Sequence, residues 1–262
     1  GAPASSGADF IDYVIADPVV VPPANRRFLH EASILLPHCY MVTDDAPSLA
    51  PAAPTRAAEN LPERALVLCC FSQPYKIEPT VFDCWMRILR QVPDSVLWLW
   101  DSRGLAADAL RREAQARGVG PERLVFAPSR PKPEHLRRLP LADLALDTLV
   151  CNGHTTAIDL LWAGVPLLTV TGPHWAARVS SSALKAIGLP ELAHADLASF
   201  ESQALALARD PAQRAAVRQR LAANRGSTPL FDTPGFVRSL EAALLAVWQR
   251  HCRGNAPAVV HI

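Results

Sequence analysis

The sequence predicts an α/β fold in which helices cover both faces of a parallel β-sheet. The first observation is that, from Arg64 onward, short apolar segments alternate with helical segments of roughly ten to fifteen residues, the pattern of successive βα units. The second is the run 146–170, which reads as a strand, a Gly-containing turn, a short helix and a second apolar strand. Both observations indicate strands that run in one direction.

The elements are expected in the following order. Short strands at 11–15 and 35–42 come first, and the stretch 44–62, rich in Pro and Ala, reads as a loop or linker. The predicted strands of the main sheet lie at 65–71, 95–100, 124–127 and 144–147. The predicted helices lie at 80–91, 105–117, 209–224 and 236–251, and a further helix begins within 133–138.

The short helix in the run 146–170 begins with Thr155 and Thr156. Unpaired N–H groups and the positive end of the helix dipole favour an anion such as a diphosphate at such a position. Asp159 falls on roughly the same helix face, where its carboxylate is able to accept hydrogen bonds from a ribose. A structural alternative fits equally well, because Thr caps open many helices that bind nothing and Asp159 reads also as a surface carboxylate.

Three polar segments follow predicted strands, at 73–76, 129–135 and 151–156. Because ligands of parallel α/β sheets bind outside the carboxyl ends of the strands, we expect these segments to converge on one edge. The sequence contains neither a P-loop nor the triple glycine of dinucleotide-binding proteins at this position. Nucleoside triphosphate hydrolysis and hydride transfer are therefore unsupported.

Composition narrows the class of protein further. The 262 residues are half apolar, and 26 basic residues balance 25 acidic ones, so we expect no general attraction to nucleic acid or to a membrane. No apolar stretch is long enough to span a membrane, and the six cysteines lack CxxC spacing. We expect reduced thiols, no metal site, a cytoplasmic location and, since the first residue is Gly rather than Met, a piece of a longer chain.

Residues 151–156 read Cys-Asn-Gly-His-Thr-Thr, and Asp159, Leu-Trp-Ala-Gly at 161–164 and Pro166 follow them. This pattern closely resembles the donor-site motif of the O-GlcNAc transferases, which move N-acetylglucosamine from UDP-GlcNAc to Ser and Thr hydroxyls of proteins. Further blocks of resemblance occur in order at 1–3, 6–7, 11–13, 36–38, 73–76, 92–99, 134–138 and 178–179. Agreement over that many ordered blocks is far more specific than one motif.

The resemblance implies a GT-B glycosyltransferase, with two Rossmann-like lobes, the donor in the cleft and tetratricopeptide repeats before them. It divides this chain into the end of the amino-terminal lobe at 1–45, a linker at 46–63, the donor-binding lobe at 64–235 and a closing helix and tail at 236–262. The chain shows no 34-residue period, so the repeats and most of the amino-terminal lobe are expected as partners outside it.

The resemblance also assigns roles to single residues. Spacing alone reads Lys76 as a solvated surface lysine, whereas the matching family lysine contacts the donor diphosphate and stabilises charge on the departing UDP without a metal. The other residues matched to donor binding are Pro3, Gln73, Lys132, His135, Arg138, His154, Thr155, Thr156 and Asp159.

Within that set, Gln73 faces the diphosphate, His135 stacks on the uracil, Lys132 touches the uridine and Arg138 supports that pocket, as the resemblance implies. For His154 we prefer a positioning role over that of catalytic base. Arg130, where the family has a smaller residue, and Leu149-Val150 depart from the family pattern.

The sequence-based hypothesis is an inverting, metal-independent transfer of N-acetylglucosamine from UDP-GlcNAc to Ser and Thr hydroxyls of acceptor proteins, with no cofactor. Two alternatives stay open. One is another GT-B reaction of a UDP-sugar, such as transfer to a small molecule or an epimerisation. The other is a noncatalytic module that binds a UDP-sugar.

Overall fold

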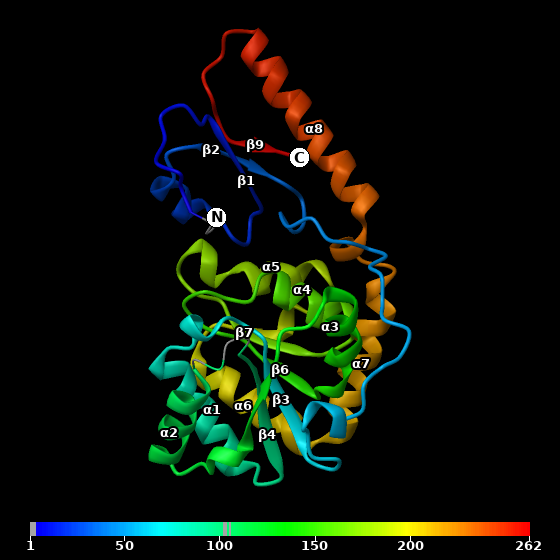
Figure 1. Cartoon of the computed structure of the whole chain (residues 1–262). Coiled ribbons are helices and arrows are strands. Elements are labelled where there is room, and N and C mark those ends of the chain that lie inside the picture. The colour runs from blue at the N-terminus through cyan, green and yellow to red at the C-terminus, as the bar shows by residue number, and fades with distance from the viewer. Residues whose placement is uncertain (1–3, 102–103, 105) are drawn as a thin grey trace.

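The computed structural model describes residues 4–101, 104 and 106–262. Within this part of the chain there are two β-sheets, each made of parallel strands, and the smaller one lies above the larger one in Figure 1. The larger sheet contains β3 (Leu66–Cys70), β4 (Ser95–Trp100), β5 (Leu124–Ala127), β6 (Leu144–Leu146), β7 (Leu167–Val170) and β8 (Ala193–His194). The smaller sheet contains β1 (Tyr13–Ala16), β2 (Ala32–Leu35) and β9 (Val260–His261).

The strand order of the larger sheet is β5-β4-β3-β6-β7-β8, and this order indicates where on the sheet a ligand would bind. The chain builds outward from β3 to β5 on one side and then returns to start again at β6 on the other side. The strand order therefore reverses between β3 and β6. In open parallel sheets this reversal opens a crevice at the carboxyl ends of the two strands, and ligands bind there.

Helices cover the larger sheet on both faces (Figure 1). The helices of the described chain are α1 (Pro79–Gln91), α2 (Ala107–Ala116), α3 (Lys132–Arg138), α4 (Thr155–Trp162), α5 (Val179–Ala186), α6 (Leu197–Arg209), α7 (Pro211–Arg225) and α8 (Thr233–Cys252), of which α8 packs on the smaller sheet. Helix α1 begins with two common helix-start features. The Glu78 carboxylate accepts hydrogen bonds from the backbone N–H groups of Thr80 and Val81, and Pro79 occupies the first helical position. All residues of β3 are buried, as expected for a central parallel strand.

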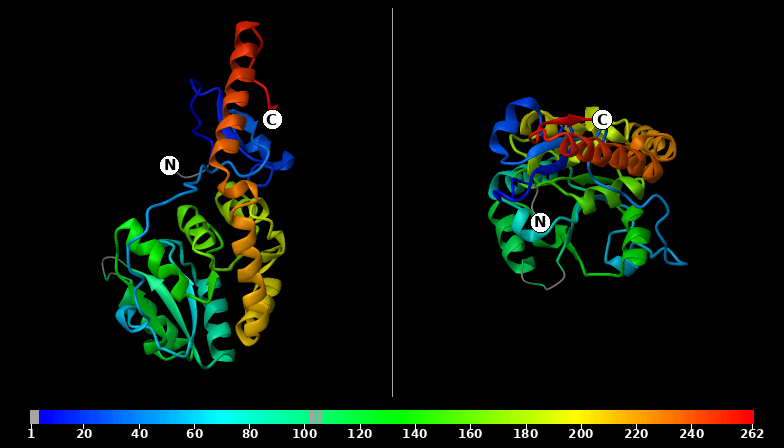
Figure 2. Two further views of the ribbon diagram at one scale, coloured as in Figure 1. Left: turned by 90° about the vertical axis from the view of Figure 1, so that its right-hand side faces the viewer. Right: turned by 90° about the horizontal axis from the view of Figure 1, so that it is seen from above.

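The smaller sheet joins the two ends of the described chain. The last strand, β9, pairs in parallel with β2, which in turn pairs with β1. The long helix α8 carries the chain from the larger sheet to the smaller one, beyond the end of α7 (Figure 2). Ile34, Leu36 and Ala243 form the buried cluster between this helix and the sheet.

Hydrogen bonds to a buried carboxylate connect the two sheets. Asp17, at the end of β1, is fully buried and accepts a hydrogen bond of 2.7 Å from the hydroxyl of Ser182 in α5. The same carboxylate accepts from the backbone N–H of Tyr40 at 3.0 Å. Nearby, the guanidinium of Arg178 donates to the carbonyl oxygens of Val19 and Gly172. These contacts fix the loops of the larger sheet against the smaller sheet.

Most of the predicted elements form, but one predicted strand is wrong and two helices were not predicted. The predicted strands at 95–100 and 124–127 coincide with β4 and β5, but the expected strand at 35–42 is wrong, because β2 spans Ala32–Leu35. Residues 36–42 form bends in which Leu36 and Cys39 are buried, so their apolar character reflects burial rather than strand pairing. Helices α5 and α6 were not anticipated.

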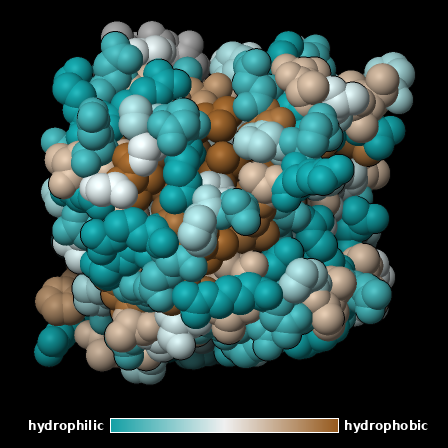
Figure 3. All heavy atoms as spheres, turned by 90° about the horizontal axis from the view of Figure 1, so that it is seen from below, coloured by the Kyte–Doolittle hydropathy of each residue, from teal (hydrophilic) through white to brown (hydrophobic). Residues whose placement is uncertain are grey.

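The surface of the molecule is mostly polar at the end opposite the smaller sheet. Seen from below, hydrophilic side chains surround a central area where hydrophobic atoms are visible (Figure 3). Among the described residues, no helix combines the length and the apolar character that a membrane crossing needs.

Candidate functional site

The turn after β6 is built around one buried carboxylate. Asp147 is 3% exposed, and its Oδ1 accepts hydrogen bonds from the backbone N–H groups of Gly153 at 2.7 Å and Thr148 at 2.9 Å. Its Oδ2 accepts from the hydroxyl of Thr169 in β7 at 2.8 Å. Burial raises the pKa of Asp147, and the hydrogen bonds, led by that of Ser180, oppose this shift. Asp147 thus ties the turn to two neighbouring strands.

Asp147 was not among the residues predicted from the sequence to shape the site. Its position in the sequence could have indicated this role. Asp147 directly follows an apolar strand and precedes a Gly-containing turn, and an acidic side chain in such a place often accepts hydrogen bonds from backbone N–H groups of the turn.

Gly153 is required because the turn passes very close to the helix that follows. A Cβ atom at this position would lie 2.9 Å from Oγ1 of Thr156 and 3.2 Å from the backbone nitrogen of Ala157. Real Cβ atoms essentially never lie as close as the first of these distances, and the second is tighter than most Cβ contacts. The glycine therefore lets the turn press against the first residues of α4.

Helix α4 begins at Thr155, as the sequence predicted. His154 is the N-cap residue, and within the described chain its side chain makes no capping hydrogen bond. Thr155 and Thr156 lie inside the first turn, so neither is the N-cap that the structural alternative supposed. The first N–H groups of α4 consequently keep the capacity to bind an anion.

Two side chains from different elements converge on this turn. The ammonium of Lys76, in the 3₁₀ helix at Pro74–Lys76, donates a hydrogen bond of 2.8 Å to the carbonyl oxygen of Asn152. The ring of His154 is hydrogen-bonded to the backbone of Ala176. Burial is the main cause that lowers the pKa of His154, and the nearby Lys76 adds to it. His154 is therefore neutral at pH 7, which agrees with a positioning role.

A further feature of His154 points to a ligand. Its Nε2 atom is buried and has no hydrogen-bond partner in the part of the chain that the structure describes. Buried polar atoms in native proteins normally have a partner, so this ring nitrogen, beside Lys76 and a helix N-terminus, has an acceptor position left for a polar group of a ligand. Gln73 precedes the 3₁₀ helix of Lys76 and is exposed on the same side of the sheet edge.

Lys132 and Asp159 form an ion pair between α3 and α4. Asp159 is 8% exposed, and burial raises its pKa while the contact with Lys132 opposes the shift. The pair lines a cavity of about 150 Å³ together with Thr155, and Thr43 and Asp44 of the preceding segment close its other side. The two residues expected to contact the uridine therefore contact one another.

His135 lies against the end of β3. Its ring is edge-on to Phe71, with 5.2 Å between ring centroids. Nε and Nη2 of Arg138 lie 3.2 Å and 3.1 Å from Nδ1 of His135, and since a guanidinium only donates, Nδ1 is the acceptor and Nε2 carries the proton. Burial, with Arg138 and Lys132 adding, lowers the pKa of His135 to about 4. The ring is thus neutral at pH 7 and suited to stack on a base.

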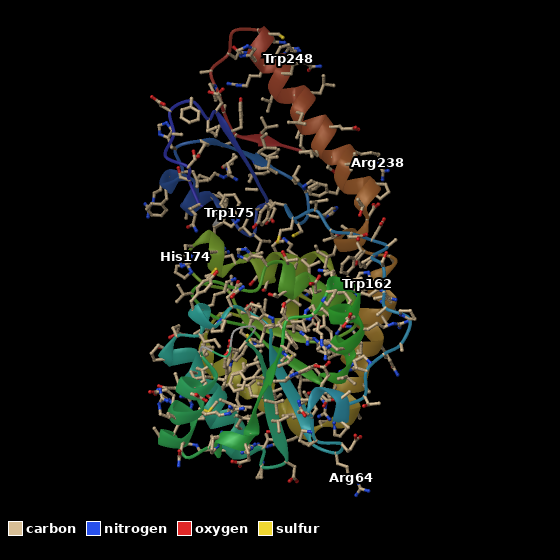
Figure 4. All side chains as sticks on the ribbon, viewed as in Figure 1. Arg64, Trp162, His174, Trp175, Arg238 and Trp248 are labelled. Atoms are coloured by element: carbon tan, nitrogen blue, oxygen red, sulfur yellow. The ribbon has the colours of Figure 1, made fainter. Side chains whose placement is uncertain are left out.

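The larger cavity beside this edge lies between the two sheets. It measures about 530 Å³ and is lined mainly by apolar atoms, with Val20 and Phe28 on one side and His174 and Trp175 on the other. His174 and Trp175 lie at the level where the upper sheet meets the loops of the larger one (Figure 4). Pro3, which the resemblance also placed at the donor, lies outside the described residues.

Taken together, the three predicted segments meet at the carboxyl ends of β3, β5 and β6, next to the reversal of strand order. Lys76, His154 and Thr155 surround the turn, whereas Lys132, His135, Arg138 and Asp159 form a neighbouring group. Among the described residues there is no cluster of three or more His, Cys, Asp or Glu side chains arranged to hold a metal ion.

Comparison with known proteins identifies the family. Residues 48–240 match the model of glycosyl transferase family 41. The chain belongs to this family. It is 38% identical over 263 residues to a protein of Arabidopsis thaliana described as a probable UDP-N-acetylglucosamine–peptide N-acetylglucosaminyltransferase SEC, an alignment that covers 98% of this chain and 27% of that protein.

Other relatives of this family 41 chain agree. A UDP-N-acetylglucosamine–peptide N-acetylglucosaminyltransferase of Caenorhabditis elegans is 40% identical over 200 residues, which cover 76% of this chain and 17% of that protein. The chain thus spans about a quarter or less of the length of these curated relatives. The resemblance to O-GlcNAc transferases that the sequence motifs indicated is confirmed.

The solved structure of a Thermobaculum terrenum O-GlcNAc transferase mutant superposes with a TM-score of 0.83 at 31% identity, over 93% of this chain and 46% of that chain. The Anabaena protein HepE, solved with UDP and glucose, superposes with a TM-score of 0.63 at 14% identity, over 90% of this chain and 63% of that chain, and supports the fold alone. The fold of the family 41 chain is that of the GT-B glycosyltransferases.

Proposed function

We propose that this chain supplies the donor-binding side of an enzyme that transfers N-acetylglucosamine from UDP-GlcNAc to Ser and Thr hydroxyls of proteins, with inversion and without a metal. The observation that carries the proposal is the meeting of Lys76, the orphaned Nε2 of His154 and the N-terminus of α4 around one glycine turn. This arrangement offers a cation and backbone N–H groups to one diphosphate, and it places the neutral His154 ring, whose Nε2 is an acceptor, beside them. The donor named by the relatives supports the choice of ligand.

In the proposed reaction, the oxygen of the acceptor hydroxyl attacks the anomeric carbon from the face opposite the diphosphate. The bond from that carbon to the β-phosphate oxygen breaks, and its electron pair stays on the departing UDP. Lys76 and the first N–H groups of α4 stabilise this growing negative charge. The acceptor proton leaves to a base that this chain does not identify.

The neighbouring group of side chains would hold the uridine. Asp159 would accept hydrogen bonds from the ribose while Lys132 neutralises its charge, and His135 would stack on the base. Acceptor proteins, the rest of the catalytic region and tetratricopeptide repeats are the proposed partners, and a cytoplasmic location is proposed with them.

The decisive assay compares acceptors. Full-length enzyme is incubated with labelled UDP-GlcNAc and either protein or small-molecule acceptors, and the stereochemistry of the new linkage is determined. We expect a β-linked product on Ser or Thr of proteins, because inversion converts the α-linked donor. Transfer confined to small molecules would favour the other GT-B reaction, and UDP-GlcNAc binding without any turnover would favour a noncatalytic module.

Transfer is expected to persist in excess EDTA. Lys76 and the α4 N-terminus supply the positive charge that a divalent ion would otherwise provide to the diphosphate. The measurement is the initial rate with EDTA, followed by addition of magnesium or manganese. If EDTA abolishes transfer and either metal restores it, the metal-free mechanism is wrong.

Replacing Asp159 by alanine is expected to weaken binding of both UDP and UDP-GlcNAc by about tenfold to a hundredfold, the range of a hydrogen bond to a charged group. A ribose contact acts on ground and transition states alike, so kcat should change much less. Titration calorimetry on the folded variant measures the affinities. Asp108→Ala, whose side chain is 85% exposed, is the control. Unaltered UDP affinity in folded Asp159→Ala would refute the ribose assignment.

A further inference from the structure

The segment between the two sheets contains a buried carboxylate that the proposed reaction does not use. Glu59 ends the 3₁₀ helix at Ala57–Glu59 and is 5% exposed, although the surrounding stretch is rich in Pro and Ala and mostly lies at the surface. A buried carboxylate is costly unless charged partners compensate it. Its partners therefore indicate why it is there.

Both oxygens of Glu59 face guanidinium groups from α3 or the loop before it. Oε2 lies 3.3 Å from Nη1 of Arg138, and Oε1 lies 3.6 Å from Nη2 of Arg130. Arg138 is 1% exposed, whereas the side chain of Arg130 is 41% exposed. The carboxylate thus faces one arginine inside the protein and one at the surface.

Arg138 divides its donors between two partners. Nη1 faces Glu59, while Nε and Nη2 both face Nδ1 of His135. The guanidinium also lies over aromatic rings, 5.5 Å from the centroid of Phe71 and 5.8 Å from that of Trp98. Because the guanidinium is planar and its donors have fixed directions, the position of Glu59 determines which edge of Arg138 reaches His135.

We propose that Glu59 is a positioning residue for the nucleobase pocket: it holds Arg138 in the orientation that makes Nδ1 of His135 an acceptor and leaves the proton on Nε2. This inference rests on the proposed function, in which the His135 ring stacks on the base. A neutral ring in a single tautomer, held edge-on to Phe71, presents one constant face to the ligand. Glu59 acts on the ligand only through Arg138 and His135.

The test uses Glu59→Gln in the full-length enzyme, which removes the charge and keeps the shape of the side chain. Nitrogen-15 NMR of the nucleotide-free protein reports the His135 tautomer, and calorimetry reports UDP affinity. We expect a signal from protonated Nδ1 to appear and UDP binding to weaken about tenfold, roughly the contribution of one hydrogen bond. Glu134→Gln is the matched control, because Glu134 lies 3.7 Å from Arg130 but its side chain is half exposed.

A Glu59→Gln variant that keeps the wild-type tautomer and UDP affinity, with only a lower melting temperature, would overturn the proposal, since Glu59 would then merely neutralise Arg138. If Glu59→Gln does not fold, Glu59→Asp carries the same test with a shortened carboxylate. A mixed tautomer with weakened UDP binding supports the proposal, and wild-type behaviour overturns it. Failure of the wild-type protein to bind UDP would refute the proposed function instead, and the tautomer measured without nucleotide would still decide the role of Glu59.

Discussion

Replacing Lys76 by alanine is expected to lower kcat about a hundredfold to a thousandfold in the full-length enzyme while changing UDP affinity much less. The ammonium already lies at the glycine turn, 2.8 Å from the carbonyl oxygen of Asn152, so it needs little reorganisation to meet a phosphate. Its effect on kcat exceeds its effect on binding because negative charge on the departing UDP is greatest in the transition state. Steady-state transfer rates and UDP calorimetry measure the two effects separately.

Lys185→Ala is the matched control for this variant. Lys185 is an exposed lysine in α5, and its removal changes the net charge equally without touching the turn. Near-normal kcat in Lys76→Ala would remove Lys76 from the mechanism. An equal loss of UDP affinity and kcat/KM, with kcat unchanged, would make Lys76 a binding residue only.

Replacing Asp147 by alanine is expected to lower the free energy of unfolding by about 3 kcal/mol or more and to abolish detectable UDP binding. The substitution removes the acceptor of several buried donors, namely the backbone N–H groups of Thr148 and Gly153 and the hydroxyls of Thr169 and Ser180. The turn that carries His154 loses its anchor at the same time. Urea unfolding measures the stability, and calorimetry measures the binding.

Thr169→Val provides a graded comparison for Asp147→Ala. It removes one donor to the same carboxylate but keeps the hydrogen bonds to the turn, so we expect a loss of only about 1 kcal/mol and nearly normal UDP binding. Equal stability losses in the two variants would contradict the account in which Asp147 organises the turn.

Much of the main sheet follows from the sequence alone. The strand at 95–100 and the helix from Thr155 were predicted correctly, because apolar runs of strand length and helical periodicity reflect burial that each segment requires by itself. The ordering of βα units also implied that polar segments after the strands meet at one edge. The structure brings Lys76 to the turn at 151–154 as that rule requires.

Pairings between distant segments were decided only by the tertiary structure. The strand β9 is two residues long and has no pattern of its own, and it exists because α8 carries it back to β2. The segment 36–42 reads as a strand, but it forms no strand, and its residues Leu36 and Cys39 are buried outside any sheet pairing.

The same distinction separates the candidate site residues that the sequence predicted from the residues whose contacts only the structure shows. Motif residues such as Lys76 and Asp159 stand in short segments whose residue types already indicate phosphate or ribose chemistry. Asp147 and Glu59 act through partners that lie elsewhere in the chain, such as Thr169 and Arg138. The sequence pattern of one segment indicates which of its residues are buried and which are exposed. The partner of a buried charge, in contrast, lies in another segment, so it depends on how the segments pack in the folded chain.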